Sequence, residues 1–136
     1  MRLASCHRDL PVDIETAWSL VSTPAGLTQW LATDATLELR PGGAVRWTHD
    51  DGAIVAGEVV AATPPSQLVF TYGWERGRFD VAPGSTEVTI SLTPLEPQRT
   101  RVAVEHRGLS AEMAAAHEGG WTHFLGELVR AAGDEQ

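Results

Sequence analysis

The segment HEGGWTHF, residues 117–124, places two histidines beside a tryptophan and a pair of glycines. A histidine can act as a general acid or base near neutral pH, bind a metal ion or orient a ligand. His117 and His123 are six positions apart, about 120° around a helix, whereas metal ligands on one helical face lie three or four positions apart. The spacing therefore excludes a metal pair. His117 shares the helical face of Trp121 and is predicted either to orient a ligand or to form a hydrogen bond at the helix edge, while His123 is predicted to be solvated.

A third histidine lies in the segment RVAVEHRG, residues 101–108, where the side chains alternate as in a β-strand. The alternation places His106 on the same face as Val102 and Val104, so we expect it to be mostly buried. Three functions fit such a histidine. It can be a core side chain satisfied by hydrogen bonds, a polar group that orients a ligand, or a general acid/base with an ordinary pKa of about 6.5.

Aromatic side chains form a second one-faced pattern, in which Leu68, Phe70, Tyr72 and Trp74 alternate along one predicted strand. Such a stripe usually belongs to a hydrophobic core. The Tyr72 hydroxyl and the Trp74 indole N–H, however, need hydrogen-bond partners if they are buried, and a ligand or water at a pocket mouth would supply them. Trp47, which is predicted to point inward, raises the same question.

Outside these clusters the sequence contains one potential buried charge, one long connection and one thiol. Glu58, in AGEVV, would be costly if it pointed inward, and we predict that it points outward. The stretch ERGRFDVAPGS, residues 75–85, is too long for a tight hairpin and is a candidate lid over a cavity. Cys6 is the only cysteine, so no internal disulfide or zinc–thiolate cluster can form, and a packed, unreactive thiol is expected.

A sheet and a long helix must position these side chains. Residues 2–9 fit a first strand, followed by two short helices, the second over 24–30. From there to residue 107 the hydrophobic period is two, which predicts six strands in an antiparallel meander. Residues 110–132 predict one long helix that covers the sheet. We expect one α+β domain over residues 1–136, with room for a pocket of roughly 300 to 1,000 Å³ between sheet and helix.

Composition and charge exclude several classes of protein. The formal net charge is −8, which makes nucleic acid a poor partner, and the absence of lysine excludes Schiff-base chemistry. No phosphate-binding loop, nucleophile elbow or zinc-binding helix motif occurs, so no cofactor or metal is expected. No hydrophobic run is long enough to span a membrane. The N-terminus MRLASCHRDLPVD lacks the apolar stretch of a secretory signal, so we expect a cytoplasmic protein.

Five stretches, in order and over nearly the whole chain, resemble the heat shock protein 90 ATPase activator-like family of the START/birch-pollen-allergen (SRPBCC) superfamily. They are AWSLVSTPAGLTQWL (17–31), LRPGGAVRW (39–47), DGAIVAGEVVAATPPSQLVFTYGW (51–74), TRVAVEHRGL (100–109) and HEGGWTHFLGEL (117–128). The resemblance implies a helix-grip fold, in which a curved antiparallel sheet wraps around a long C-terminal helix and encloses a cavity. The family's glycine–tryptophan pair, here Gly120 and Trp121, recurs where the long helix meets the sheet, and we expect Gly120 to allow close approach of the two.

The superfamily includes ligand carriers and polyketide cyclases, so the resemblance leaves several functions open. We expect binding of a small, largely hydrophobic molecule by a monomer or homodimer. A cofactor-independent cyclase or dehydratase acting on polyketide-like compounds is one alternative, and a chaperone-linked interaction module is another. The expected ligand-binding residues are Trp47, Phe70, Tyr72, Trp74, His106, His117, Trp121 and Phe124. The cyclase would need His106 or His117 to meet a second polar group inside the cavity.

Overall fold

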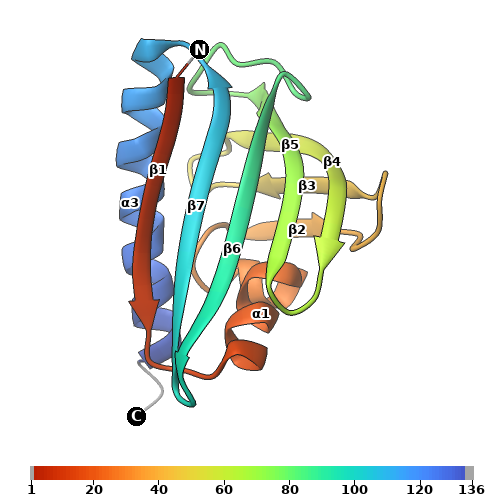
Figure 1. The fold of residues 1–136 in the computed structure, drawn as a ribbon. Helices are drawn as coiled ribbons and strands as arrows, with labels where there is room; N and C mark the ends of the chain where they lie inside the picture. The colour runs from red at the N-terminus through yellow and green to blue at the C-terminus, as the bar shows by residue number, and fades with distance from the viewer. Residues whose placement is uncertain (1, 134–136) are drawn as a thin grey trace.

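The computed structural model describes residues 2–133, which form one seven-stranded antiparallel sheet, two short helices and one long helix (Figure 1). In chain order the elements are β1 (Arg2–Leu10), α1 (Ile14–Ser22), α2 (Pro24–Leu27), β2 (Asp34–Leu37), β3 (Ala44–Thr48), β4 (Ile54–Thr63), β5 (Gln67–Arg76), β6 (Thr86–Glu96), β7 (Arg99–Leu109) and α3 (Ala111–Gly133). None of the helices in this described part of the chain is long and apolar enough to cross a membrane.

The strands follow the order β1-β7-β6-β5-β4-β3-β2. Strands β2 to β7 form a meander, and the last strand, β7, also pairs with the first, β1. Every neighbouring pair is antiparallel. The predicted α+β helix-grip fold is thus confirmed. Figure 1 shows α3 running alongside β1 and β7, with α1 below the sheet near β6. On the outer edge of β1, the backbone N–H of Ser5 donates a hydrogen bond to Glu118 Oε1 of α3 at 3.1 Å.

Alternation along the strands and a single face of α3 create the core between sheet and helix. The alternating residues Val102, Val104 and His106 of β7 are buried, as the two-residue period predicts. The buried face of α3 comprises Ala114, His117, Trp121, Leu125, Leu128 and Ala132, which lie three or four positions apart. Full burial of a leucine such as Leu125 or Leu128 stabilises the fold by roughly 1.5 to 3 kcal/mol. The long helix is continuous, as predicted.

The second short helix ends earlier than the predicted range of 24–30. Thr23 caps it, because its hydroxyl oxygen accepts a hydrogen bond from the Gly26 backbone N–H at 2.9 Å. After Leu27 the chain continues in turns, and the indole N–H of Trp30 donates to the carbonyl of Leu20 in α1 at 2.8 Å. This tertiary hydrogen bond holds the chain in a non-helical path that leads into β2.

The expected close approach at Gly120 is wrong. A Cβ atom placed on Gly119 or Gly120 would meet no heavy atom within 4 Å. Glycine is required by contact elsewhere, for example at Gly73 in β5, where a Cβ atom would overlap the Ala82 carbonyl group. That close approach lets the β5–β6 connection (residues 77–85) fold back against β5, where the backbone N–H of Trp74 donates to the Val81 carbonyl at 2.6 Å.

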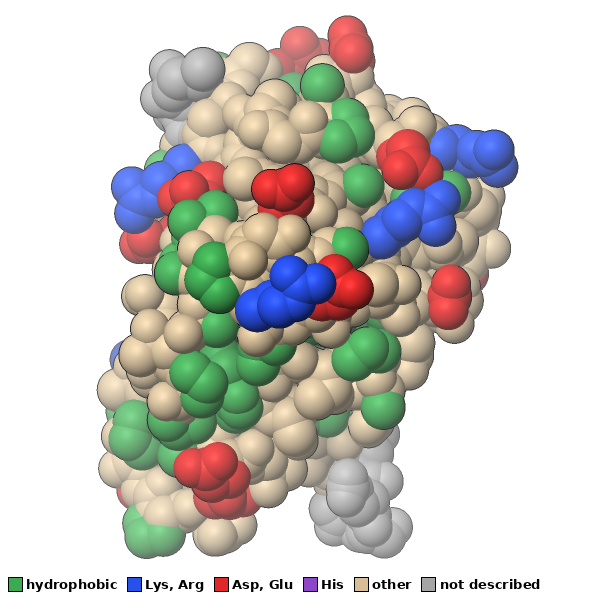
Figure 2. All heavy atoms as spheres, turned by 90° about the vertical axis from the view of Figure 1, so that its right-hand side faces the viewer, with side chains coloured by type: hydrophobic (Ala, Val, Ile, Leu, Met, Phe, Trp, Pro, Cys, Tyr) green, Lys and Arg blue, Asp and Glu red, His purple; other side chains and the backbone are tan. Residues whose placement is uncertain are grey.

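The surface carries interspersed charges and few large hydrophobic side chains. Figure 2 shows arginine and carboxylate side chains next to one another on one face, with hydrophobic side chains gathered below them. The ion pairs of the protein are exposed, as in the 2.7 Å pair of Arg46 and Glu75, and such pairs contribute little to stability. Glu58 is exposed and points outward, as predicted. The large hydrophobic side chains that are more than a third exposed are Leu3, Leu39, Val60 and Leu95, which come from separate segments.

Cys6, in β1, is half-buried. Burial raises the pKa of its thiol, an effect opposed by a hydrogen bond with Thr122. A thiol with a raised pKa is a weak nucleophile at neutral pH, in agreement with the expected unreactive cysteine.

Candidate aromatic pocket

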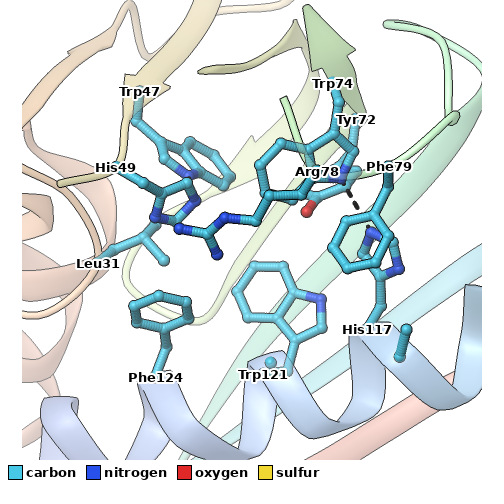
Figure 3. Close-up of a pocket in the computed structure, with 12 residues that line it drawn as sticks. Leu31, Trp47, His49, Tyr72, Trp74, Arg78, Phe79, His117, Trp121 and Phe124 are labelled. Carbon is cyan, nitrogen blue, oxygen red and sulfur yellow. Dashed lines mark hydrogen bonds between the residues drawn. The ribbon is translucent and has the colours of Figure 1, made fainter. Parts of the chain in front are cut away.

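A pocket of about 110 Å³ lies between the sheet and α3, and we call it the aromatic pocket (Figure 3). It is smaller than the expected range of roughly 300 to 1,000 Å³, because large aromatic side chains fill much of the space between sheet and helix. β3 contributes Trp47, β5 contributes Tyr72 and Trp74, and α3 contributes the floor. The lining residues are Leu31, Trp47, His49, Tyr72, Trp74, Arg78, Phe79, Ala116, His117, Gly120, Trp121 and Phe124. Aromatic rings thus approach the space from both the sheet and the helix.

The structure brings together most of the side chains that the sequence suggested as a site. Trp47, Tyr72, Trp74, His117, Trp121 and Phe124 all line the aromatic pocket. Two of the expected residues do not. Phe70 lies beside a separate apolar void of about 10 Å³ and packs edge-on against Trp47, with ring centroids 5.9 Å apart. His106 is fully buried behind the lining and does not reach the pocket surface.

Each of the three tryptophans in the lining donates its indole N–H to a histidine. Trp74 Nε1 donates to His117 Nε2 at 3.0 Å, and Trp47 Nε1 donates to His49 Nε2 at 3.1 Å. Trp121 Nε1 donates to His106 Nδ1 at 3.1 Å. A buried indole needs an acceptor for its N–H group. These pairs supply it within the protein, so the lining tryptophans present only apolar surface to a ligand.

His106 is a core histidine whose two ring nitrogens are both used by the protein. Since Nδ1 accepts from Trp121, the ring proton is on Nε2, which donates to Thr86 Oγ1 at 2.9 Å. The Thr86 hydroxyl in turn donates to the Tyr72 carbonyl at 2.7 Å. Burial, with a smaller contribution from His117, lowers the pKa of His106 to about 3. Of the three functions open to this residue, the geometry favours the satisfied core side chain.

The two histidines that do line the pocket are also neutral, and each accepts an indole N–H. Nδ1 of His117 donates to the Met113 carbonyl at 2.8 Å, which leaves Nε2 as the acceptor for Trp74. Burial lowers the pKa of His117. Burial, followed by the charge of Arg78, lowers the pKa of His49, whose Nε2 accepts from Trp47. Both ring nitrogens of His117 and Nε2 of His49 are therefore used within the protein.

Tyr72 lies at the centre of the cluster of aromatic rings and imidazoles that surrounds the pocket. Its ring centroid is 4.3 Å from that of His106, 5.7 Å from that of His117 and 5.8 Å from that of Trp47. Burial raises the pKa of Tyr72, so its hydroxyl stays protonated, although the charge of Arg78 opposes the effect. The hydroxyl is therefore a neutral polar group in the pocket wall.

The β5–β6 connection, which the sequence suggested as a lid, contributes Arg78 and Phe79 to the lining. The Phe79 ring centroid lies 4.7 Å from that of His117 and 5.4 Å from that of Trp74. Figure 3 shows the Arg78 guanidinium reaching across the pocket toward His49. Its central carbon lies 5.7 Å from the centroid of the Trp74 ring, and its Nε donates to Asp51 Oδ2 at 2.8 Å. Hydrogen bonding to Arg78 lowers the pKa of Asp51 to about 2.

A wider, more polar outer groove of about 500 Å³ adjoins the aromatic pocket. Both spaces are lined by Leu31, His49, Arg78, Gly120 and Phe124, and we call the region bounded by these five residues the passage. The outer groove also includes residues 28–33 and the polar side chains of Asp50, His123 and Glu127. His123 is exposed, as predicted. Gly120 lies in the passage, where its missing side chain leaves space open.

Sequence reasoning missed several lining residues: Leu31, His49, Arg78, Phe79, Ala116 and Gly120. His49 had a detectable signal, because it continues the alternation of Val45 and Trp47. Arg78 and Phe79 had only the unusual length of their connection. No group of three or more His, Cys, Asp or Glu side chains within residues 2–133 is placed to hold a metal ion.

Solved structures share this fold over almost the entire chain. Protein MLL2253 from Mesorhizobium loti has a TM-score of 0.85 at 22% identity, with 99% of both chains covered. The AHSA1 protein from Silicibacter pomeroyi has a TM-score of 0.81 at 26% identity, covering 99% of this chain and 100% of that one. The Aha1 dimer from Colwellia psychrerythraea has a TM-score of 0.80 at 19% identity, covering 97% and 96%. No curated protein matches the chain.

The family described as "Activator of Hsp90 ATPase homolog 1-like protein" matches residues 11–133. The match covers both short helices, the strands from β2 to β7 and all of α3. It agrees with the resemblance carried by the five sequence stretches and with the observed helix-grip fold. The chain therefore belongs to the family of activator of Hsp90 ATPase homolog 1-like proteins.

Proposed function

We propose that the protein binds a small, largely hydrophobic organic molecule in the aromatic pocket. The observation that carries this proposal is the internal pairing of the Trp47, Trp74 and Trp121 indoles with histidines. Pairing leaves a preformed apolar surface around an open space, as expected for a small-molecule site. An engineered apolar cavity of roughly 150 Å³ binds benzene, so a pocket of about 110 Å³ can take at most one ring, and that ring would extend partly into the outer groove. A larger ligand would extend into the outer groove.

The same hydrogen bonds argue against acid–base catalysis by a cyclase or dehydratase. That function would need His106 or His117 to meet a second polar group at the ligand. Both imidazoles instead use both of their nitrogens within the protein. A general base needs a free lone pair within hydrogen-bonding distance of the proton that it removes. The geometry thus supports binding over this type of catalysis.

A chaperone-linked interaction module would be supported by a large exposed apolar patch. The large hydrophobic side chains with substantial exposure, Leu3, Leu39, Val60 and Leu95, are distributed over different segments. The aromatic pocket, which is lined from both the sheet and α3, is therefore the stronger basis for a function than these four exposed hydrophobic residues.

The adjacent glycines of α3 offer a matched test of the binding proposal. Both Gly119 and Gly120 have open space where a side chain would begin, but only Gly120 lines the pocket. Gly120→Leu should fill the passage, whereas Gly119→Leu adds the same side chain one position away. We expect a neutral single-ring probe, benzyl alcohol, to shift the NMR signals of the lining indole N–H groups in the parent and in Gly119→Leu. The same shifts should be lost in Gly120→Leu.

Equal responses in the two variants would show that the probe does not enter through this passage. An absence of indole shifts in the parent, at concentrations up to those where the probe perturbs the whole spectrum, would contradict binding in the aromatic pocket. Trp47→Phe, Trp74→Phe and Trp121→Phe assign the three signals.

A further inference from the structure

We propose that the ligand is a small aromatic acid, whose ring lies in the aromatic pocket and whose carboxylate pairs with the Arg78 guanidinium at the passage. This inference rests on the proposed binding function and specifies the chemical class of the ligand. The inference depends on which polar groups around the pocket already form hydrogen bonds within the protein and which do not.

The polar side-chain groups inside the aromatic pocket are uncharged, and most of them are paired within the protein. The three indole N–H groups of the lining donate to histidine nitrogens, and Nδ1 of His117 donates to the Met113 carbonyl. The Tyr72 hydroxyl is a neutral group. Burying an unpaired charge among such side chains is strongly unfavourable. The polar end of an amphipathic ligand must therefore face the passage, where Arg78 lies.

Arg78 has N–H groups at the passage that are available to bind a ligand. Its Nε is bonded to Asp51, but neither Nη1 nor Nη2 donates to an acceptor in the described residues 2–133. A guanidinium presents its N–H groups in a planar fork, and two Nη groups side by side match the two oxygens of a carboxylate. The Arg78 side chain is 35% exposed and lines both the pocket and the outer groove, so a ligand in the passage can reach it.

The charge of the lining selects an anion over a cation. Arg78 carries the only formal charge among the residues that line the aromatic pocket, since that lining contains no carboxylate and its histidines are neutral. Asp50 and Glu127 line only the outer groove, and Glu127 is paired with Arg130 at 3.2 Å. A cationic ligand would place its charge against Arg78, whereas a carboxylate would gain a charge-assisted hydrogen bond.

Asp51 already binds the Arg78 guanidinium and would compete with the carboxylate of a ligand for it. It holds the Arg78 side chain through Nε while partly neutralising its charge. Removing that carboxylate should make the guanidinium more attractive to an anion, provided that Arg78 stays over Trp74 through the cation–π contact. Asp51→Asn should therefore bind an aromatic carboxylate more tightly than the parent does.

The test compares three probes of similar size and different charge: benzoate, benzamide and benzylammonium. Binding is followed at pH 7 through the NMR signals of the lining indole N–H groups. We expect the parent to bind benzoate about tenfold or more tightly than benzamide, and benzylammonium most weakly. Arg78→Gln should abolish the preference for the anion, so that this variant binds benzoate and benzamide equally. Arg76→Gln, which removes an exposed arginine at the end of β5 outside the lining, should change neither affinity.

The outcomes separate this inference from the proposed function. Equal binding of benzoate and benzamide by the parent would overturn the assignment to Arg78 while leaving ligand binding intact. Tightest binding of benzylammonium would also overturn it and would indicate a cation-binding aromatic site. Loss of all probes in Arg78→Gln with an unchanged overall spectrum would mean that Arg78 shapes the passage and does not recognise charge. Failure of all three probes to shift the parent's indole signals would contradict both proposals.

Discussion

Replacing Gly120 by alanine should stabilise the protein, although the same glycine lies beside a functional pocket. In the interior of a helix, glycine is less favourable than alanine by about 1 kcal/mol. A Cβ atom at Gly120 meets no heavy atom within 4 Å, so no steric term opposes this gain. Unfolding entropies of roughly 2.1 cal/mol/K per residue convert about 1 kcal/mol into a rise in Tm of about 3 to 4 °C for 136 residues.

Gly119→Ala should give a similar increase, because its Cβ atom also meets open space. The double variant should gain about 2 kcal/mol if the sites are independent. Gly26→Ala is the opposite control, since its Cβ atom would overlap the Ser19 carbonyl oxygen. Urea denaturation of the four proteins beside the parent measures these differences. A Gly120→Ala protein with unchanged or reduced stability would refute the reasoning and show that glycine is needed there for its backbone.

Three further predictions concern the buried polar groups and the β5–β6 connection. The pKa of His106 in the folded protein, about 3, is below its unfolded value. The neutral imidazole therefore stabilises the fold above about pH 6.5, and this stabilisation is lost as the pH falls toward 3. In that range the free energy of unfolding should change by up to about 1.4 kcal/mol per pH unit. Denaturation at several pH values should show at least this slope in the parent and in His123→Ala, because the lowered pKa values of His49 and His117 add to it, and a flat profile across that window would contradict it. Trp121→Phe removes the donor to His106 Nδ1 and should destabilise by about 1 to 3 kcal/mol in urea denaturation, whereas a neutral effect would mean that the acceptor finds another partner. Gly73→Ala should cost about 1 to 3 kcal/mol, because its Cβ atom overlaps the Ala82 carbonyl, and unchanged stability would show that the connection can move away freely.

The fold was predictable because its two hydrophobic periods extend over many residues. The two-residue period recurs in the strands from β2 to β7, although β4 pairs with β5 through register shifts, and the helical period runs through α3 without a break. The inward direction of His106 followed from the same alternation, and the structure confirms its burial. The second short helix was predicted too long, since residues 28–32 form turns whose backbone N–H groups bond to Pro24, Gly26 and Leu27, and a local hydrophobic pattern does not distinguish such turns from a helix.

The candidate site was only partly predictable. The hydrophobic period of a strand or helix shows which face a side chain lies on, but it does not show whether that side chain meets a packed core or an open pocket. Phe70 and Trp74 belong to the same stripe on β5, yet Trp74 lines the aromatic pocket and Phe70 lies beneath it. The same limit explains the error at Gly120, where the pattern correctly predicted a helix but not the emptiness beside it. Arg78 lies in an irregular connection, where no period indicates the direction of a side chain.

The hydrogen bond from Ser5 to Glu118 has a consequence for assembly and aggregation. An open sheet has two edge strands, and unpaired N–H groups on such an edge invite strand addition by another chain. Here α3 runs along the β1 edge, and the Glu118 carboxylate occupies the outward N–H of Ser5 with a negative charge. The opposite edge is β2, a strand of four residues, which is too short to template a long pairing. Extension of the sheet from protein to protein is therefore disfavoured at both ends, and a dimer of this chain would more readily form through side chains than through a continuous intermolecular sheet.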